Sequence, residues 1–237
     1  MNKIAIIPAR GGSKRIPRKN IKDFLGKPII AYSIEAALKS QIFDIVMVST
    51  DDDEIAEIAK SYGAKVPFMR STELSSDTAG TAPVILEVLD IYAKKNVCFE
   101  YGCCIYPCAP LVTSEKLKES MNLLVAENCD TIVPIVKFSY PPQRGLVIRN
   151  EFTVMVEPKN YTVRSQDLEP IYHDAGQFYC FSVAALKEQK TLFCKNTRSL
   201  VLSELEVQDI DTNEDWEIAE MKFLFKKQNY IITKDVN

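Results

Sequence analysis

The fold is decided near the start of the chain, which reads Ile4-Ala5-Ile6-Ile7-Pro8 and continues directly into Ala9-Arg10-Gly11-Gly12-Ser13-Lys14-Arg15-Ile16-Pro17-Arg18-Lys19-Asn20. The first run is continuously apolar, which is typical of a strand buried on both faces of a parallel sheet. Such sheets bind their ligands beyond the carboxyl ends of the strands. The loop 9–20 is therefore the first candidate for a binding site.

This loop has the composition of a polyphosphate cradle. Gly11 and Gly12 allow a sharp turn that turns backbone N–H groups toward an anion, and Ser13 adds a hydroxyl. The loop is neither a Walker A sequence nor a G-x-G-x-x-G fingerprint. A solvated basic turn is the alternative, but clustered basic side chains favour phosphate binding. These side chains are Arg10, Lys14, Arg15, Arg18, Lys19 and Lys22.

Strand and helix signals alternate along the rest of the chain, which predicts a single α/β domain over 1–237 with a mostly parallel sheet and helices on both faces. Pro28 opens a helix whose apolar face holds Ile30, Ile34, Ala37 and Leu38. Asp51 and Glu54 form a capping box for a helix that ends at Gly63. We further expect strands at 45–48, 103–106, 131–136, 177–182 and 200–207, and helices at 83–95, 114–128 and 213–227.

The alternation stops between 138 and 175, where no amphipathic helix fits. This stretch holds Pro141-Pro142, a short alternating segment at 152–156 and a polar run from Asn160 to Asp174. We interpret it as an inserted β-arm that is too thin to hold a core of its own. The arm must therefore pack against something else.

An acidic pair lies near the end of the chain, in Asp209-Ile210-Asp211. In extended backbone both carboxylates face the same side and can bind one cation. The alternative is that Asp211 only starts the following helix and Asp209 is exposed. For Asp215, a carboxylate that complements the helix dipole is the favoured interpretation. With a single histidine in the chain, a metal must be held by carboxylates, which indicates Mg²⁺ or, as a second choice, Mn²⁺.

Two polar stretches are further candidates. Arg164 and Gln166 lie in the arm, and His173-Asp174-Ala175-Gly176-Gln177-Phe178 follows it. Dense polar groups around a glycine suit a sugar-acid pocket, with arginine for a carboxylate and glutamine for hydroxyl groups. The stretch from Arg70 to Thr81 is rich in small polar residues, and we interpret it either as a flexible loop near the site or as plain surface.

The composition excludes other classes of partner. There are 29 basic and 32 acidic residues, a net charge of −3, which leaves no electrostatic footprint for nucleic acid. No apolar run reaches the roughly 20 residues of a membrane helix. The seven cysteines have no zinc-like spacing, and we expect reduced, mostly buried thiols in a cytoplasmic protein.

The motifs together resemble the acylneuraminate cytidylyltransferase family, from about residue 3 to 227. The resemblance rests on 6–14 with Lys19-Asn20, Ser49-Thr50-Asp51, 70–77, 176–179 and Asp209-Ile210-Asp211. It implies a Rossmann-like three-layer α/β/α sandwich, with CTP as co-substrate and a homodimer in which the arm reaches the partner's active site. It implies nucleotide binding by Ala9, Arg10, Gly11, Gly12, Ser13, Lys19, Asn20, Arg70 and Asp77. It implies catalytic roles for Arg10, Lys19, Asp209 and Asp211, the last two also as metal ligands.

Two departures from the family pattern bear on the sugar. Arg15 and Arg18 stand where sialic-acid members commonly have glycine, and Tyr106 stands where they have glutamine. These changes resemble the pseudaminic acid cytidylyltransferase branch, so we expect a nine-carbon sugar acid as the second substrate. The expected sugar-binding residues are Tyr106, Arg164, Gln166, His173, Gln177 and Phe178. The alternatives are the sialic, legionaminic and deoxy-octulosonic acid enzymes, a nucleotide-sugar glycosyltransferase, or a non-catalytic nucleotide-binding module.

Overall fold

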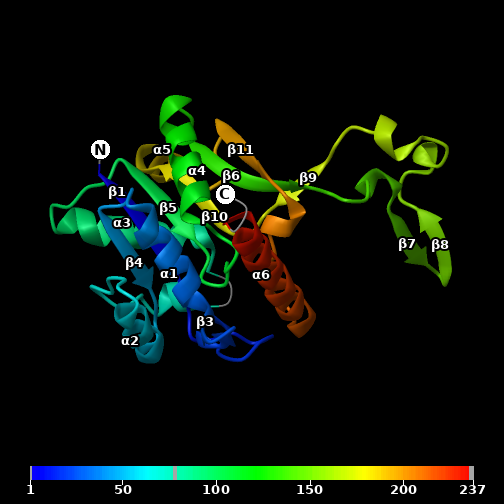
Figure 1. The fold of residues 1–237 in the computed structure, drawn as a ribbon. Helices are drawn as coiled ribbons and strands as arrows, with labels where there is room; N and C mark the ends of the chain where they lie inside the picture. Colours follow the sequence, from blue (N-terminus) through cyan, green and yellow to red (C-terminus); the bar gives the residue numbers. More distant parts are fainter. Residues whose placement is uncertain (1, 77–78, 235–237) are drawn as a thin grey trace.

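A twisted central sheet carries helices on both faces (Figure 1). The computed structural model describes residues 2–76 and 79–234, with side chains as far as 228. Within these residues the sheet has seven strands, ordered β11-β6-β10-β5-β1-β4, and β9 also pairs with β6. The bounds are β1 Lys3–Pro8, β4 Ile45–Ser49, β5 Tyr101–Ile105, β6 Thr131–Lys137, β9 Tyr172–Asp174, β10 Phe178–Ser182 and β11 Thr197–Leu202.

The sheet is mixed but mostly parallel, as predicted. Strand β1 runs parallel to both β4 and β5, and β11 runs parallel to β6. Strand β10 is antiparallel to β5 and β6, and β9 is antiparallel to β6. The carboxyl ends of β1, β4 and β5 therefore meet at one edge of the sheet, where the candidate loops begin.

Helices cover the two faces of the sheet and create two hydrophobic cores. Side chains of β1 alternate between them, since Ala5 and Ile7 enter one core and Ile4 and Ile6 the other. The first core is completed by α1 (Ile29–Ser40), α2 (Asp53–Ser61) and α4 (Ser114–Ala126), and the second by α3 (Thr81–Lys94) and α5 (Val183–Gln189). This confirms the three-layer α/β/α prediction.

A third, smaller apolar cluster joins the two ends of the chain. Ile16 and Phe24, which follow β1, pack with Ile210, Trp216 and Ala219 around the start of α6 (Asn213–Lys234). The Phe24 and Trp216 rings meet edge to face with centroids 5.5 Å apart. This cluster is where the basic loop and the acidic pair come together. The short elements β2 (Asp23–Phe24), β3 (Lys27–Pro28) and the 3-10 turn η1 (Lys19–Ile21) lie beside it.

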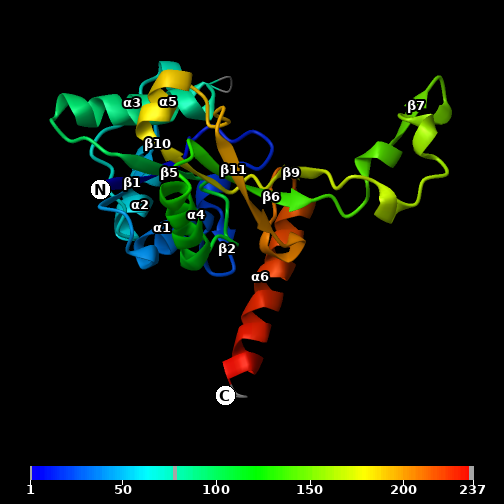
Figure 2. The same cartoon turned by 90° about the horizontal axis from the view of Figure 1, so that it is seen from above.

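The inserted β-arm is present and extends far from the body of the molecule (Figure 2). Its hairpin pairs β7 (Leu146–Arg149) with β8 (Phe152–Met155). The 3-10 turns are η3 (Pro142–Arg144), η4 (Pro158–Asn160) and η5 (Ser165–Asp167). The chain returns to the main sheet at β9, so the free part of the arm ends just before Tyr172 rather than at Ala175.

Several element boundaries differ from the prediction. The N-cap of α2 is Asp52, whose carboxylate accepts from the Ile55 N–H, because Asp51 is turned toward the basic loop. Strand β11 lies at 197–202 rather than 200–207, since 204–206 form the 3-10 turn η6 (Glu204–Glu206). Helix α6 continues to 234, beyond the predicted 227. Leu38 is 40% exposed rather than buried on the core face of α1.

The seven cysteines are free thiols, and five of them are buried, which agrees with the prediction of reduced thiols. In the described part of the chain, none of the helices combines the length and the apolar character that crossing a membrane requires.

Candidate active site

The basic loop leaves the carboxyl end of β1 and is closed on itself by Asn20. The Asn20 side chain is buried and donates from Nδ2 to the carbonyl oxygen of Arg10 over 2.8 Å. This bond ties the end of the loop to its beginning. Ala9 is buried beneath the loop, and its N–H donates to the carbonyl oxygen of Ser49 at the end of β4. The loop is therefore anchored on the sheet edge.

Gly11 is required by a close contact rather than by an unusual backbone angle. A Cβ atom at this position would lie 2.6 Å from Asp52 Oδ2, whereas one at Gly12 would meet no atom within 4 Å. The Gly11 N–H donates to Asp51 Oδ1 over 3.0 Å. The start of α2 is thus fitted against the turn of the basic loop.

Arg18 fastens the other side of the loop to the same helix. Its backbone is left-handed, with φ of 54°, and its guanidinium donates to both Asp52 and Glu54. The Arg18 hydrogen bonds lower the pKa of the Asp52 carboxyl, against a smaller opposing effect of burial. An arginine thus holds a backbone conformation that glycine adopts more easily.

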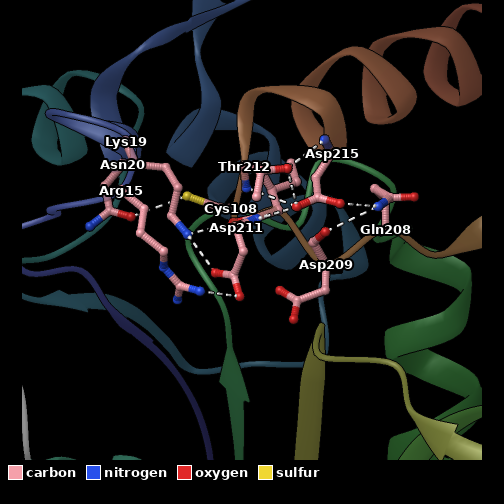
Figure 3. Close-up of polar contacts among 10 residues, drawn as sticks. Arg15, Lys19, Asn20, Cys108, Gln208, Asp209, Asp211, Thr212 and Asp215 are labelled. Atoms are coloured by element: carbon pink, nitrogen blue, oxygen red, sulfur yellow. Dashed lines mark hydrogen bonds and ion pairs between the residues drawn. The ribbon is translucent and has the colours of Figure 1, made fainter. Parts of the chain in front are cut away.

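The acidic pair lies opposite the loop and is bound to it (Figure 3). Lys19 Nζ donates to the carbonyl oxygen of Ile210 over 2.6 Å and lies 3.7 Å from Asp211 Oδ1. Arg15 Nη1 lies 2.7 Å from Asp211 Oδ2. Burial, and next the charge of Asp211, raise the pKa of Asp209. Residues 208–211 form no strand, yet Asp209 and Asp211 border the same pocket.

Asp215 supports this pair from behind. Its Oδ2 accepts from the Asp211 N–H, the Thr212 N–H and the Thr212 hydroxyl over 2.8–3.0 Å, and its own N–H donates to Thr212 Oγ1. This confirms the interpretation of Asp215 as a carboxylate of the first helical turn. Its role is to fix the backbone that presents Asp211.

The pocket between the loop and the pair has a volume of about 310 Å³, a size typical of small-molecule sites. Eight of the predicted residues line it: Arg10, Ser13, Lys19, Asn20, Arg70, Tyr106, Asp209 and Asp211. Arg70 is buried, which lowers its pKa, and it donates to the Ser49 carbonyl and, over 3.1 Å, to Ser49 Oγ. The Tyr106 hydroxyl lies 3.3 Å from Thr81 Oγ1. Asp77 lies outside the described residues.

Of the six expected sugar-binding residues, Tyr106 lines this pocket, and the other five do not. Phe178 is fully buried in the first core, and Gln177 is 2% exposed with Nε2 bonded to the Glu206 carbonyl. Both side chains therefore lie inside the fold rather than on the pocket wall, which corrects the expectation that they contact a sugar. Arg164 and Gln166 lie in the arm, where Arg164 pairs with Asp167.

His173 borders a second hollow, of about 370 Å³, on the other side of the acidic pair. This hollow is also lined by Asp209 and Asp211, so the pair separates it from the first pocket. The imidazole packs against Phe138 with ring centroids 4.8 Å apart, and Nδ1 lies 2.9 Å from the Asp174 carbonyl oxygen. These contacts favour a structural role for His173.

Two pocket residues were missed by sequence reasoning. The Cys108 thiol donates to Asn20 Oδ1 over 3.2 Å, and burial raises its pKa to about 12. Its position in an apolar run gave no signal of this contact. Gly176, with φ of 61°, comes so close to the acidic pair that a Cβ would lie 3.4 Å from Asp209 Cγ. The sequence analysis predicts that the stretch around Gly176 binds a sugar, and it does not predict the close approach of Gly176 to Asp209.

In the described residues no group of three or more His, Cys, Asp or Glu side chains is arranged to hold a metal ion by itself. Asp209 and Asp211 nevertheless fit Mg²⁺, because this ion is commonly held by one or two carboxylates together with substrate phosphates. Their hard oxygen donors, beside a pocket with basic walls, match that requirement.

Known proteins resemble the chain over nearly its full length. It is 44% identical to the pseudaminic acid cytidylyltransferase of Campylobacter jejuni, over 95% of this chain and 97% of the relative. It is 33% identical to the CMP-N,N'-diacetyllegionaminic acid synthase of Legionella pneumophila, over 93% and 95%. The solved structure of a CMP:2-keto-3-deoxy-manno-octonic acid synthetase complexed with CTP shares the fold, with a TM-score of 0.70 at 18% identity, over 96% of this chain and 100% of that one.

The family model described as "Cytidylyltransferase" matches residues 4–220, which include both the basic loop and the acidic pair. The chain belongs to the cytidylyltransferase family, and its substrate is CTP.

Proposed function

We propose that this enzyme transfers the CMP part of CTP to a nonulosonic acid and releases pyrophosphate. Pseudaminic acid is the preferred acceptor. The observation that carries the proposal is the meeting of the basic loop with Asp209 and Asp211 in one pocket. The names of the relatives at 44% and 33% identity support a nine-carbon sugar acid as the acceptor. Sialic, legionaminic and deoxy-octulosonic acids are the alternative acceptors.

The phosphates of CTP lie against the basic loop. Arg10 and Lys19 supply positive charge, Ser13 a hydroxyl, and the loop backbone N–H groups. Mg²⁺ or Mn²⁺, held by Asp209 and Asp211, supplies charge neutralisation at the phosphates when it is bound. Asp215 fixes the backbone of Asp211, and Gly176 leaves room for the Asp209 side chain.

In the reaction, the anomeric hydroxyl of the sugar acid loses its proton, which is released as H⁺, and its oxygen attacks the α-phosphorus of CTP. The bond from this phosphorus to the bridging oxygen of the β-phosphate breaks, and pyrophosphate leaves. The chain contributes by holding the reactants in line and by neutralising charge that builds up on the leaving pyrophosphate. Lys19, fixed by the Ile210 carbonyl, is preorganised for the second task.

Tyr106 forms the wall that faces the sugar. Its hydroxyl is engaged with Thr81, and its ring packs edge to face against Tyr179, with centroids 5.6 Å apart. The side chain therefore presents an aromatic surface to the pocket. Such a surface suits the terminal methyl group of pseudaminic acid better than the hydroxyl group of sialic acid.

A homodimer completes the site. The arm exposes large apolar side chains to solvent, including Ile148, which is 78% exposed, and Phe152, which is 73% exposed. Apolar surface of this extent on a hairpin without a core indicates a covering partner. A second copy of the chain, related by a two-fold axis, covers it, and Arg164 and Gln166 then act at the partner's pocket.

We place the reaction in the cytoplasm, since free thiols are typical of a reducing compartment. The test of the function is pyrophosphate release with each of the four nucleoside triphosphates and a panel of sugar acids. We expect release only when CTP and a nonulosonic acid are both present, with pseudaminic acid the best acceptor. Absence of release from CTP with every nonulosonic acid would contradict the proposal.

A further inference from the structure

Asp211 is enclosed by two basic side chains of the loop. Arg15 lies 2.7 Å from Oδ2 and Lys19 lies 3.7 Å from Oδ1, so each carboxylate oxygen faces a positive charge (Figure 3). A divalent cation needs one of these oxygens, and a positive group at the same oxygen repels it. One of the two basic side chains must therefore leave Asp211 when a cation binds there.

The two side chains differ in how firmly they are held. Lys19 also donates to the carbonyl oxygen of Ile210 over 2.6 Å, and its side chain is only 21% exposed. The Arg15 side chain is 70% exposed, and an ion pair so open to water is a weak contact. Arg15 is consequently the side chain that a cation displaces.

The displaced guanidinium remains beside the nucleotide pocket that the proposed function implies. Arg15 lines the same pocket as Ser13 and Lys14, which belong to the same basic loop. The planar fork of a guanidinium matches a pair of phosphate oxygens. The phosphates of CTP carry more negative charge than the carboxylate of the sugar acid, and they are the partners that replace Asp211.

We propose that Arg15 exchanges partners during catalysis: it neutralises Asp211 in the free enzyme and binds the CTP phosphates once a divalent cation occupies the acidic pair. The inference rests on the proposed function, because it needs CTP and a cation in this pocket. It adds a phosphate-binding residue at a position where the chain departs from the family pattern.

The exchange gives Arg15 opposite effects on the two ligands. A cation that binds alone must first displace the guanidinium, so Arg15 weakens its binding. A nucleotide that binds with the cation gains the guanidinium, so Arg15 strengthens its binding. A residue with a merely structural role would weaken both ligands or neither when it is replaced.

The experiment measures two affinities for the wild-type protein, Arg15→Ala and Arg15→Lys. Titration calorimetry gives the affinity for Mn²⁺ without nucleotide and the affinity for CTP at saturating Mn²⁺. We expect Arg15→Ala to bind Mn²⁺ about threefold more tightly and CTP about tenfold more weakly. Arg15→Lys should restore part of the affinity for CTP, since it keeps the charge without the fork.

The matched control is Arg198→Ala, which removes an equally simple exposed ion pair, 2.9 Å long, between Arg198 and Glu127. It should leave both affinities unchanged. Wild-type affinity for Mn²⁺ or for CTP in Arg15→Ala, or weaker binding of Mn²⁺, would overturn the exchange. If the wild-type protein bound Mn²⁺ no more tightly than Asp211→Asn does, this result would contradict both the proposed metal site and the exchange.

Discussion

Lys19 Nζ lies 2.6 Å from the carbonyl oxygen of Ile210, although 191 positions separate the two residues in the chain. The bond fixes the backbone between Asp209 and Asp211 relative to the basic loop. The positions of the acidic pair and of the loop are therefore coupled, so that a shift of one segment shifts the other. Changes to either segment should appear in the binding of both ligands.

Asp209→Asn and Asp211→Asn should each lower turnover by orders of magnitude, because one metal interaction is worth several kcal/mol in the transition state. The fold should be kept, since both side chains border the pocket and not a core. Pyrophosphate release at saturating CTP and Mg²⁺ measures the loss, and circular dichroism checks the fold. Near-normal turnover in both variants would show that the pair has been assigned wrongly.

Gly11→Ala should destabilise the protein, whereas Gly12→Ala should not. The new Cβ in Gly11→Ala would lie 2.6 Å from Asp52 Oδ2, and Asp52 cannot retreat easily because it caps α2 and is bound by Arg18. Overpacking of this kind costs about 1–3 kcal/mol. Thermal unfolding without nucleotide isolates this effect from ligand binding. Equal melting temperatures for the two variants would contradict the steric account.

Asp52→Asn should lower stability at neutral pH, but not in acid. The pKa of Asp52 is lowered in the folded protein, first by its hydrogen bonds to Arg18. The ionised form therefore stabilises the fold at every pH above the ordinary value near 4, and this contribution is lost as the pH falls through the lower, folded pKa. Asparagine keeps the helix cap, so the expected loss at pH 7 is about 1 kcal/mol.

Urea unfolding at pH 7 and at a series of acidic pH values measures this difference. Glu57→Gln is the control, since Glu57 belongs to an exposed pair with Lys60 and should change the free energy of unfolding by less than about 0.5 kcal/mol. A difference between Asp52→Asn and wild type that stayed constant down to the acid transition would exclude the charge as its cause.

Tyr106→Gln should reduce the preference for pseudaminic over sialic acid. In the wild-type protein, burying the extra hydroxyl of sialic acid against the ring without a partner costs about 1–3 kcal/mol, which is roughly 5- to 150-fold in discrimination. Glutamine offers that hydroxyl a hydrogen-bond partner. The kcat/KM values for pseudaminic, legionaminic and sialic acids at saturating CTP decide the matter.

Tyr106→Phe is the matched control, because it keeps the aromatic surface and removes the hydroxyl that contacts Thr81 and Tyr179. It should keep the preference for pseudaminic acid. Equal or better turnover of sialic acid by the wild-type enzyme would contradict the proposed preference for pseudaminic acid. The assignment of CTP as substrate would not be affected.

Charged residues in the arm should separate the proposed homodimer into monomers. Ile148→Asp together with Phe152→Asp places two carboxylates on the most exposed apolar part of the hairpin. We expect light scattering to give the mass of a dimer for the wild-type protein and of a monomer for this variant, with lower activity. A wild-type monomer with full activity would remove the proposed role of the arm.

The sequence was sufficient for the features that depend on local patterns. The apolar run before the loop could only be a strand buried on both faces, and the break in the alternation at 138 marked the arm. The basic loop could be placed at a binding edge because ligands gather at the carboxyl ends of parallel strands. The resemblance to a family supplied the pairing of loop and metal site.

The features that could not be predicted depend on contacts between distant segments. Asp51 and Asp52 are equally good caps by composition, and the choice falls on Asp52 because Asp51 accepts from the Gly11 N–H. Gln177 and Phe178 belong to a matching motif, yet strand geometry turns Phe178 into the core. Cys108 appears in the sequence as one more apolar residue, and only the fold brings its thiol to Asn20.

The small cluster of Ile16, Phe24, Ile210, Trp216 and Ala219 has a consequence for biosynthesis. On the ribosome, Ile16 and Phe24 emerge early, but their partners Ile210, Trp216 and Ala219 are translated only after nearly two hundred further residues. Until then these apolar side chains remain exposed to solvent unless a chaperone covers them. The nascent chain can pair its first strands while it has no nucleotide site, and catalytic competence arrives only with the last helix.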